Sequence, residues 1–491
     1  MRCCAGMRVL LFALLGLACL AAAADRPNIV VILSDDYGWG SVGCYGANPE
    51  LVKTPNLDRL AREGRRFTDA NTTSSVCSPT RYALMTGRYC WRTSLISEVL
   101  STVAPLHIET TRLTMASMLK SQGYQCAAVG KWHLGYGTAE RCDYTKELKP
   151  GPLEIGFDDH FGVPSNHGDM AGVYVENHWV AGLNRQSPSQ PSPPYVTMGQ
   201  QKGKPAKTLD LNAPKRVDED VMATLTDRIV NWIGQQSAQK PFFVYFTPVA
   251  VHNPITPSKA TAGKSKGGPF CDFIADLDLS VGRVLEVLDQ KGFAKDTLVI
   301  FTSDNGPHQE SGHDPKRFNP SGPWRGMKRS LTDGGIRVPF IAWWPGQIKP
   351  GLSAHVGHFS DLLPTAAELA GAQPPALTDG ISLLPSLQGR SAEQANHEFL
   401  YWEFHEGGFR QATLYQGRWK GIRSAPKAEA LELYDLQNDP TEQRNLAALQ
   451  PELVARLSAY LDQARSDNPD WRPQWTQAKA GRRNKAGKPK P

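Results

Sequence analysis

Acidic and amide side chains directly follow two apolar runs of this sequence. Asp35 and Asp36 come after NIVVILS, and Asp304 and Asn305 come after LVIFTS. These side chains offer only oxygen atoms, which are the ligands that calcium and magnesium prefer and zinc does not. Three carboxylates held close together repel one another unless a cation lies between them. The pattern therefore predicts a site for one divalent cation.

Basic side chains occupy comparable places in the sequence. Lys131 and His133 stand two residues apart after CAAVG, so an extended backbone would direct both to one side. His252 follows FVYFTPVAV, and Arg81 and Lys328 lie in polar segments. Each position alone is weak evidence, because a single histidine after a strand is usually structural. Together these cationic groups suit an anionic substrate and a charged transition state.

Cys77 opens the segment CSPTRYALMTGR. Pro79 is compatible with the first turn of a helix, where its missing N–H costs nothing. Arg81 follows Cys77 by about one helical turn and therefore lies on the same face. We expect Cys77 at a helix N-terminus, where backbone amides and the helix dipole favour anions. A buried thiol, half of a disulfide, a metal ligand and a nucleophile all remain open at this point.

The segments that must position these residues alternate between strand-like and helix-like runs. Strands are expected within residues 27–36, 65–72, 125–135, 241–254, 297–306 and 338–346. Helices are expected within residues 54–64, 114–123, 221–236 and 273–292. This alternation predicts an α/β fold, with a large doubly wound, mostly parallel sheet and helices on both faces. Ligands of such folds bind at the carboxyl ends of the strands, which is where the residues above stand.

The chain divides into regions of different composition. Short strand-like runs between 397 and 436, followed by a helical pattern at 451–466, predict a smaller C-terminal antiparallel sheet plus a helix. The predicted regions are a signal peptide at 1–24, a catalytic domain at 25–375 with a Pro/Ser/Gly-rich insertion at 163–214, a C-terminal α+β subdomain at 376–475 and a basic disordered tail at 476–491.

The N-terminus has the pattern of an export signal. MRCCAGMR is followed by the apolar run VLLFALLGLACL and by small residues up to Ala24. The apolar run is too short to span a bilayer stably, so no integral membrane segment is expected in the mature chain. We expect export to a periplasmic, secreted or lysosome-like compartment; a lipoprotein anchored through Cys19 is the weaker alternative.

The formal charge of +6 does not indicate a nucleic-acid partner. The tail holds six basic residues and no acid, so it accounts for the whole excess. The remainder of the chain is close to neutral, whereas nucleic-acid-binding domains carry a clear positive excess.

With these residues established, the sequence resembles the formylglycine-dependent sulfatases, the arylsulfatase family of the alkaline phosphatase superfamily. The resemblance runs from about Pro27 to about Leu449. CSPTRYALMTGR matches the signature in which the cysteine is oxidised to formylglycine (3-oxoalanine); SDDYGWG, GKWHLG and SDNG match site motifs; and KRSLTDGGIRVP matches the segment with a second site lysine. The resemblance implies an alkaline phosphatase-like fold, sulfuric ester hydrolysis, and a formylglycine-generating enzyme as maturation partner.

The resemblance also implies how the cation is held. A hydrated formylglycine at position 77 would attack sulfur while bound to one calcium ion, with magnesium as the second choice. Asp304 would additionally take the proton of the attacking hydroxyl. The implied ligands are Asp35, Asp36, Cys77, Asp304 and Asn305.

The other site residues receive roles by the same resemblance. Arg81 and Lys131 would hold the formylglycine and stabilise its charged form. Lys328 and His252 would contact the sulfate, and one of them would protonate the leaving alcohol. His133 would deprotonate the remaining hydroxyl, so that the sulfate leaves and the aldehyde returns.

The substrate is expected to be a sulfated small molecule or oligosaccharide, most specifically a sulfated sugar or glycan. His405 and Arg410 are candidates for the substrate mouth, and His308 and His313 are read as loop residues that could touch the substrate. Two other functions stay open: a formylglycine-dependent phosphonate or phosphodiester hydrolase, and an inactive exported glycan-binding homologue.

Two modifications are left open by the sequence. Asn71 stands in an NTT glycosylation sequon. The cysteines outside the signal peptide and position 77 number five, so at least one of them is unpaired within the chain. They are Cys44, Cys90, Cys126, Cys142 and Cys271.

Overall fold

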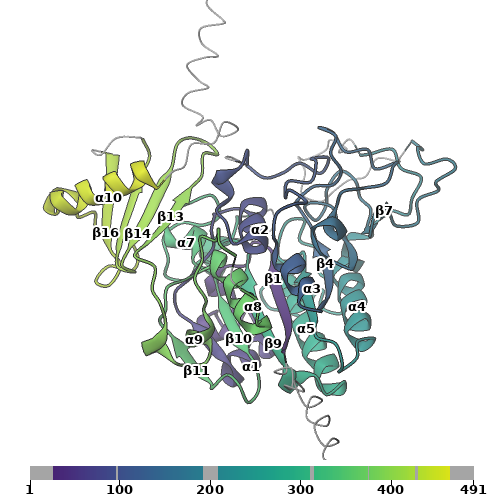
Figure 1. Cartoon of the computed structure of the whole chain (residues 1–491), viewed down its shortest axis with the longest axis horizontal. Helices are drawn as coiled ribbons and strands as arrows, with labels where there is room; N and C mark the ends of the chain where they lie inside the picture. The colour runs from purple at the N-terminus through teal and green to yellow at the C-terminus, as the bar shows by residue number, and fades with distance from the viewer. Residues whose placement is uncertain are drawn as a thin grey trace, which may run out of the picture.

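A ten-stranded sheet forms the centre of the larger part of the molecule (Figure 1). The structure is a computed structural model, and it describes residues 26–95, 98–191, 208–309, 314–373, 375–425 and 430–464. The strand order is β11-β2-β10-β9-β1-β8-β4-β5-β6-β7. The strands are β1 (Asn28–Ser34), β2 (Arg65–Phe67), β4 (Gln125–Lys131), β5 (Asp159–Val163), β6 (Val175–Glu176), β7 (Trp179–Val180), β8 (Phe242–Thr247), β9 (Thr297–Ser303), β10 (Phe340–Trp343) and β11 (Gly351–Ser353).

The centre of this sheet is parallel. Strands β9, β1, β8, β4 and β5 pair in parallel, whereas β10 and β6 run antiparallel to their central neighbours. The central strands are buried on both faces and are rich in Val, Ile and Phe, as is typical of parallel sheets. The predicted large, mostly parallel sheet is confirmed.

Helices cover both faces of the sheet. On one face Val31 of β1 shares a core with Tyr82 and Leu119, and on the other Val30 shares a core with Leu57 and Leu225. Successive side chains of a strand point to opposite faces, which explains this alternation. One face carries α2 (Cys77–Thr86), α3 (Met115–Ser121) and α8 (Leu362–Ala370), and the other carries α1 (Pro55–Glu63), α4 (Val221–Gly234) and α5 (Pro269–Gln290).

A separate four-stranded antiparallel sheet lies at one side of the molecule (left in Figure 1). It contains β13 (Phe399–Glu403), β14 (Gln411–Tyr415), β15 (Trp419–Arg423) and β16 (Leu431–Asp435). Helix α10 (Pro451–Gln463) packs on it through Leu457 and Leu461. The predicted C-terminal antiparallel sheet plus helix is therefore confirmed.

An ionic cluster joins the C-terminal sheet to a short helix of the larger part of the molecule. Lys420 of β15 contacts Asp333, the first residue of α7 (Asp333–Ile336), and lies 2.9 Å from Glu442. All three side chains are buried. The remaining short elements are β3 (Ala70–Asn71), β12 (Gly357–His358), α6 (Pro315–Phe318) and α9 (Leu384–Leu387).

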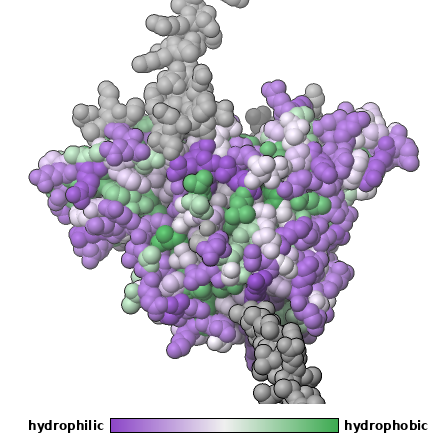
Figure 2. Space-filling model, viewed as in Figure 1, coloured by the Kyte–Doolittle hydropathy of each residue, from purple (hydrophilic) through white to green (hydrophobic). Residues whose placement is uncertain are grey.

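Several predictions are not tested by the described residues. The signal peptide at 1–24, the tail at 476–491 and residues 192–207 of the insertion lie outside them, and the exact domain boundaries stay predictions. Within the described part, no helix combines the length and apolar character needed to cross a bilayer. The face seen in Figure 2 is mostly hydrophilic, with small apolar patches. The six cysteines of this part are free thiols.

Candidate active site

The predicted site residues converge at one edge of the large sheet. Strands β9, β1, β8 and β4 are neighbours, and each is followed by a candidate residue. Ser34 pairs with Ser303 in parallel register, so the next residues, Asp35 and Asp304, emerge side by side. The N-terminus of α2 supplies Cys77 to the same place. The topology thus brings together segments that are more than 200 residues apart.

Acidic side chains form a compact cluster at this edge. One oxygen each from Asp35, Asp36 and Asp304 and the sulfur of Cys77 all lie within 4.8 Å of one another. Asn305 donates through Nδ2 to Asp36 Oδ1 at 2.7 Å, and its buried Oδ1 has no hydrogen-bond partner among the described residues. A buried acceptor of this kind is costly unless something binds it. The donor set fits a hard divalent cation, which would use that oxygen.

Three cationic side chains lie against these carboxylates. Lys131 Nζ is 2.9 and 2.8 Å from the two carboxylate oxygens of Asp35. Arg81 donates to Asp304 Oδ2 from Nη2 at 2.7 Å and from Nε at 3.1 Å. Lys328 Nζ lies 2.7 Å from Asp36. Buried charges need such partners, and the cations would also attract an anionic ligand.

Burial and charge separate the two neighbouring aspartates. Burial raises the pKa of Asp35 to about 7, although Lys131 opposes the shift. Burial also raises the pKa of Asp36, but the charges of Lys328 and His252 outweigh burial and hold this pKa well below the usual range. The environment therefore keeps Asp36 ionised, whereas Asp35 depends on a further positive charge to remain so.

Cys77 is the first residue of α2, and its Sγ lies 3.6 Å from Asp35 Oδ1. Burial, together with the nearby charge of Asp304, raises the pKa of the thiol to about 12. An unmodified thiol here is neutral at pH 7 and hence a poor nucleophile, because the reactive form is the thiolate.

Two histidines flank the acidic cluster. His252 Nε2 is 3.8 Å from Asp36 Oδ2, and its Nδ1 is 2.7 Å from the carbonyl oxygen of Asn253. His133 Nε2 is 2.9 Å from the carbonyl oxygen of Leu100, and its buried Nδ1 has no hydrogen-bond partner among the described residues. Burial, followed by the charges of nearby cations, lowers the pKa of His133 well below its usual value. His133 is thus a neutral ring with one uncommitted nitrogen.

Two site residues adopt an uncommon backbone conformation. Asp36 has a φ of 55° and His133 a φ of 56°, in the left-handed region. This region is unfavourable for residues with a Cβ and costs on the order of 1 kcal/mol or more. Such residues cluster at functional sites, where the surrounding structure holds them. Their strain supports a functional role for this edge of the sheet.

The exposed fractions of the side chains show which side of the site is open. Arg81 and Lys131 are 0% exposed, Lys328 is 4% exposed and His252 is 13% exposed. Arg329, next to Lys328, is 40% exposed. A ligand would therefore enter past Arg329, Lys328 and His252.

Sequence reasoning missed two residues at this opening. Arg329 Nε donates to Glu406 Oε1 at 2.8 Å, and Arg329 Nη1 lies 3.1 Å from His308 Nε2. The adjacency of Arg329 to Lys328 was the only available signal. Glu406 lies in the β13–β14 hairpin, whose position beside the site cannot be predicted from spacing.

The predicted mouth residues have different positions. Arg410 Nη1 donates to the carbonyl oxygen of Arg329 at 2.8 Å, which places it at the opening. His405 is buried, packs on Phe409 and lies 2.8 Å from Glu403, so the geometry favours a packing role and its substrate contact stays a prediction. His313 lies outside the described residues.

The sequon residue Asn71 is not accessible in the folded chain. Its side chain is buried in β3, and Nδ2 donates to Asp69 Oδ1 at 2.8 Å. An attached glycan would have to displace this contact.

Comparisons with known proteins identify the family of this chain. The family described as Sulfatase matches residues 27–372, and N-sulphoglucosamine sulphohydrolase, C-terminal, matches residues 324–467. The chain is 32% identical to N-acetylgalactosamine-6-O-sulfatase of Bacteroides thetaiotaomicron, over 90% of this chain and 94% of the relative. It is 33% identical to human arylsulfatase A, over 90% of this chain and 89% of the relative.

The fold is also similar to solved structures. One, described with glycosaminoglycan metabolism by Bacteroides thetaiotaomicron, superimposes with a TM-score of 0.79 at 31% identity. The superposition covers 90% of this chain and 99% of that chain.

Proposed function

This chain belongs to the sulfatase family, and from that premise we propose that it removes sulfate from sugars with a formylglycine formed from Cys77 and one calcium ion. As a sulfuric ester hydrolase it yields an alcohol and inorganic sulfate. Glycan substrates are supported by the relatives and structural neighbours, which include proteins named for sulfated sugars.

The observation that carries the proposal is the convergence at Cys77. Its sulfur lies within 4.8 Å of oxygens from three aspartates, at a helix N-terminus, with Arg81 and Lys131 close by. A structural cysteine needs none of these charged neighbours. Their presence supports an oxygen nucleophile at position 77, made there by the maturation enzyme.

Calcium would be held by the oxygen-rich cluster, and when bound it would lower the pKa of the attacking hydroxyl and offset the charge of the sulfate. The proposed donors are Asp35, Asp36, Asp304, Asn305 and the modified residue 77. The unused Oδ1 of Asn305 supports this assignment.

The other side chains divide the remaining work. Arg81 and Lys131 fix residue 77 and stabilise negative charge there, because both are buried and cationic. Lys328 and His252, at the open side, face the incoming sulfate, and one of them protonates the leaving alcohol. His133 accepts the proton of the second hydroxyl through its uncommitted Nδ1, which releases the sulfate and restores the aldehyde.

We propose 6-O-sulfated N-acetylgalactosamine as the first substrate to test, because several relatives are named for it. We also propose that the chain is exported, on the pattern of residues 1–24.

The test begins with mass spectrometry of the tryptic peptide 67–81 from chain produced with a formylglycine-generating enzyme. We expect the aldehyde at position 77, and release of sulfate from N-acetylgalactosamine 6-sulfate. An intact thiol without activity would support the inactive binding homologue. Faster hydrolysis of 4-nitrophenyl phosphonate or phosphodiesters than of 4-nitrophenyl sulfate would support the phosphonate or phosphodiester hydrolase.

A further inference from the structure

Arg329 occupies a backbone conformation that an arginine rarely adopts. Its φ is 74°, in the left-handed region that glycine enters without strain. Two backbone contacts hold it there: its N–H donates to Ser75 O at 3.0 Å, and its carbonyl oxygen accepts from Arg410 at 2.8 Å. Ser75 lies two residues before Cys77. The position is thus built into the site, although glycine would fit it with less strain.

The Arg329–Glu406 ion pair does not account for an arginine at this position. The Arg329 side chain is 40% exposed, and the Glu406 side chain is 27% exposed. Ion pairs this accessible to water contribute little to stability, so the contact offsets the backbone strain poorly. Binding of a ligand by the Arg329 side chain better explains why an arginine stands at this strained position.

The charges at this opening favour an anion. Arg329 and Arg410 bring two guanidinium groups to one place, against the single carboxylate of Glu406. Arg329 Nε and Nη1 are engaged, but Nη2 makes no hydrogen bond to another described residue and remains available. A planar guanidinium recognises carboxylate and sulfate oxygens in a defined direction.

The place of Arg329 in the chain indicates where a group bound to it would lie relative to the reacting sulfate. Arg329 follows Lys328, whose Nζ contacts Asp36 inside the site. The exposed fraction rises from 4% at Lys328 to 40% at Arg329. A group bound to Arg329 therefore lies outside the sulfate position, where the neighbouring sugar of a glycan would be.

We propose that Arg329, assisted by Arg410, binds a second oxyanion of the substrate, carried by the sugar next to the sulfated one. The oxyanion is a uronate carboxylate or a second sulfate ester. This inference rests on the proposed function, and it makes Arg329 a specificity-determining residue. Glu406 and His308 orient the guanidinium from its other edges.

The experiment compares three disaccharides. In the first, 6-sulfated N-acetylgalactosamine is linked to glucuronate. In the second, the glucuronate carboxylate is a methyl ester, so that the neighbouring sugar carries no charge. The third is that ester with a 2-O-sulfate on the glucuronate. We expect wild-type kcat/KM to be about tenfold or more higher for the first or the third than for the ester, the size of one charge-assisted hydrogen bond. The preferred one identifies the oxyanion. Equal turnover of all three would overturn the inference.

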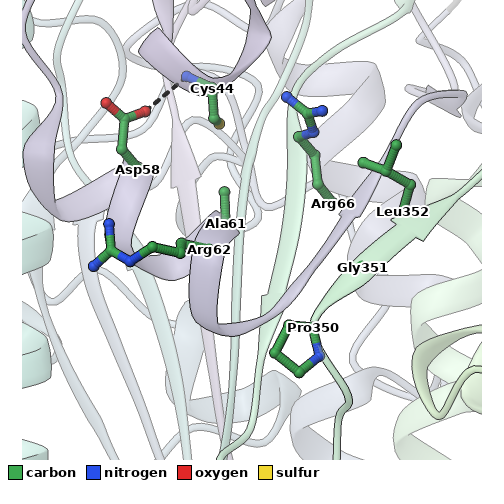
Figure 3. A pocket seen from close by; sticks show the side chains of 8 residues that line it. All are labelled: Cys44, Asp58, Ala61, Arg62, Arg66, Pro350, Gly351 and Leu352. Carbon is green, nitrogen blue, oxygen red and sulfur yellow. Dashed lines mark hydrogen bonds between the residues drawn. The ribbon is translucent and has the colours of Figure 1, made fainter.

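Variants assign the preference to the residue. The ratio to compare is kcat/KM for the preferred anionic disaccharide divided by kcat/KM for the ester. Arg329→Gln should reduce this ratio to near one, and Arg410→Gln should reduce it partly. The ratio of the wild type is measured independently of whether the variants fold. The control is Arg62→Gln, since Arg62 lies on α1 beside a separate hollow near β11 (Figure 3) and should keep the wild-type ratio. An unchanged ratio in a folded Arg329→Gln variant would overturn the assignment.

A last substrate separates the two proposals. If the wild type releases sulfate from N-acetylgalactosamine 6-sulfate but shows no anion preference among the disaccharides, only the inference fails. If it releases no sulfate from any of the four, the proposed function fails, and the inference fails with it.

Discussion

At the residue scale, the side-chain amide of Asn305 serves both as a hydrogen-bond donor and as a proposed cation ligand. Its nitrogen donates to Asp36, and its oxygen is left for a cation. An aspartate could accept a cation but could not donate this hydrogen bond. The amide thus adds an oxygen ligand without adding a fourth negative charge to the three aspartates.

Calcium should stabilise the folded chain through this cluster. At about 100 times its Kd, an ion that binds only the native state adds about 2.7 kcal/mol to the free energy of unfolding. We expect thermal unfolding of chelator-treated protein to shift upward on calcium addition, and Asn305→Ala to require more calcium for the same shift. Asn231→Ala, at an exposed position of α4, is the control. Absence of any calcium-dependent shift in the wild type would contradict the metal assignment.

Replacing the proposed nucleophile should abolish catalysis without unfolding the chain. We expect Cys77→Ala to lower kcat for an aryl sulfate by at least about 10³-fold, as loss of a nucleophile does. Cys271→Ala removes another buried thiol, in α5, and should keep wild-type kcat. Circular dichroism checks that both variants are folded. Substantial turnover by Cys77→Ala would rule out a nucleophile at this position.

The strand-end residues could be predicted because their signal is local. Asp35, Lys131 and Asp304 each follow an apolar run, and parallel strands end at the same edge. Arg329 and Glu406 could not be predicted as site residues, because the contact between them joins positions 77 residues apart in the chain. This contact depends on how the C-terminal sheet packs against the larger part of the molecule. The periodicity of the sequence predicts helices and strands, but it does not predict this packing.

At the scale of elements, the long strands were predictable and the short ones were not. β1, β8 and β9 are continuous apolar runs, whereas β11 and β12 have three and two residues. The single strand expected at 65–72 is divided into β2 and β3, which belong to different sheets. Pairing with distant partners, and not local pattern, determines such short elements.

The cluster of Lys420, Asp333 and Glu442 should be essential for docking the C-terminal sheet. Lys420→Met would remove the cation that two buried carboxylates share; Asp333 would keep Arg337 at 2.9 Å, but Glu442 would lose its close cationic partner. Breaking a buried ion pair in this way typically costs about 3–5 kcal/mol. We expect a lower midpoint in urea unfolding for this variant. The exposed Lys53→Met is the matched control and should change stability by less than about 0.5 kcal/mol. A Lys420→Met chain as stable as the control would show that the cluster does not hold the C-terminal sheet against α7.

At the scale of the whole molecule, buried histidines couple stability to pH. His160 of β5 is buried, with Nε2 2.9 Å from the Tyr136 hydroxyl and Nδ1 3.2 Å from the carbonyl oxygen of Ala128. Burial lowers the pKa of His160 to about 3. The unfolded chain therefore binds a proton below about pH 6.5, and the folded chain does not until about pH 3.

The sign of this effect follows from proton uptake. Between about pH 6.5 and pH 3 the unfolded state holds more protons at position 160, so the stability contributed by neutral His160 is present above pH 6.5 and is lost as pH falls. One unit below pH 6.5 the loss is about 1.4 kcal/mol. We expect urea unfolding to show that the decrease in stability from pH 7 to pH 5.5 is smaller in His160→Gln than in the wild type by about that amount. Because every other titrating group is common to both chains, the difference isolates His160, and an equal or larger decrease in the variant would contradict a neutral His160.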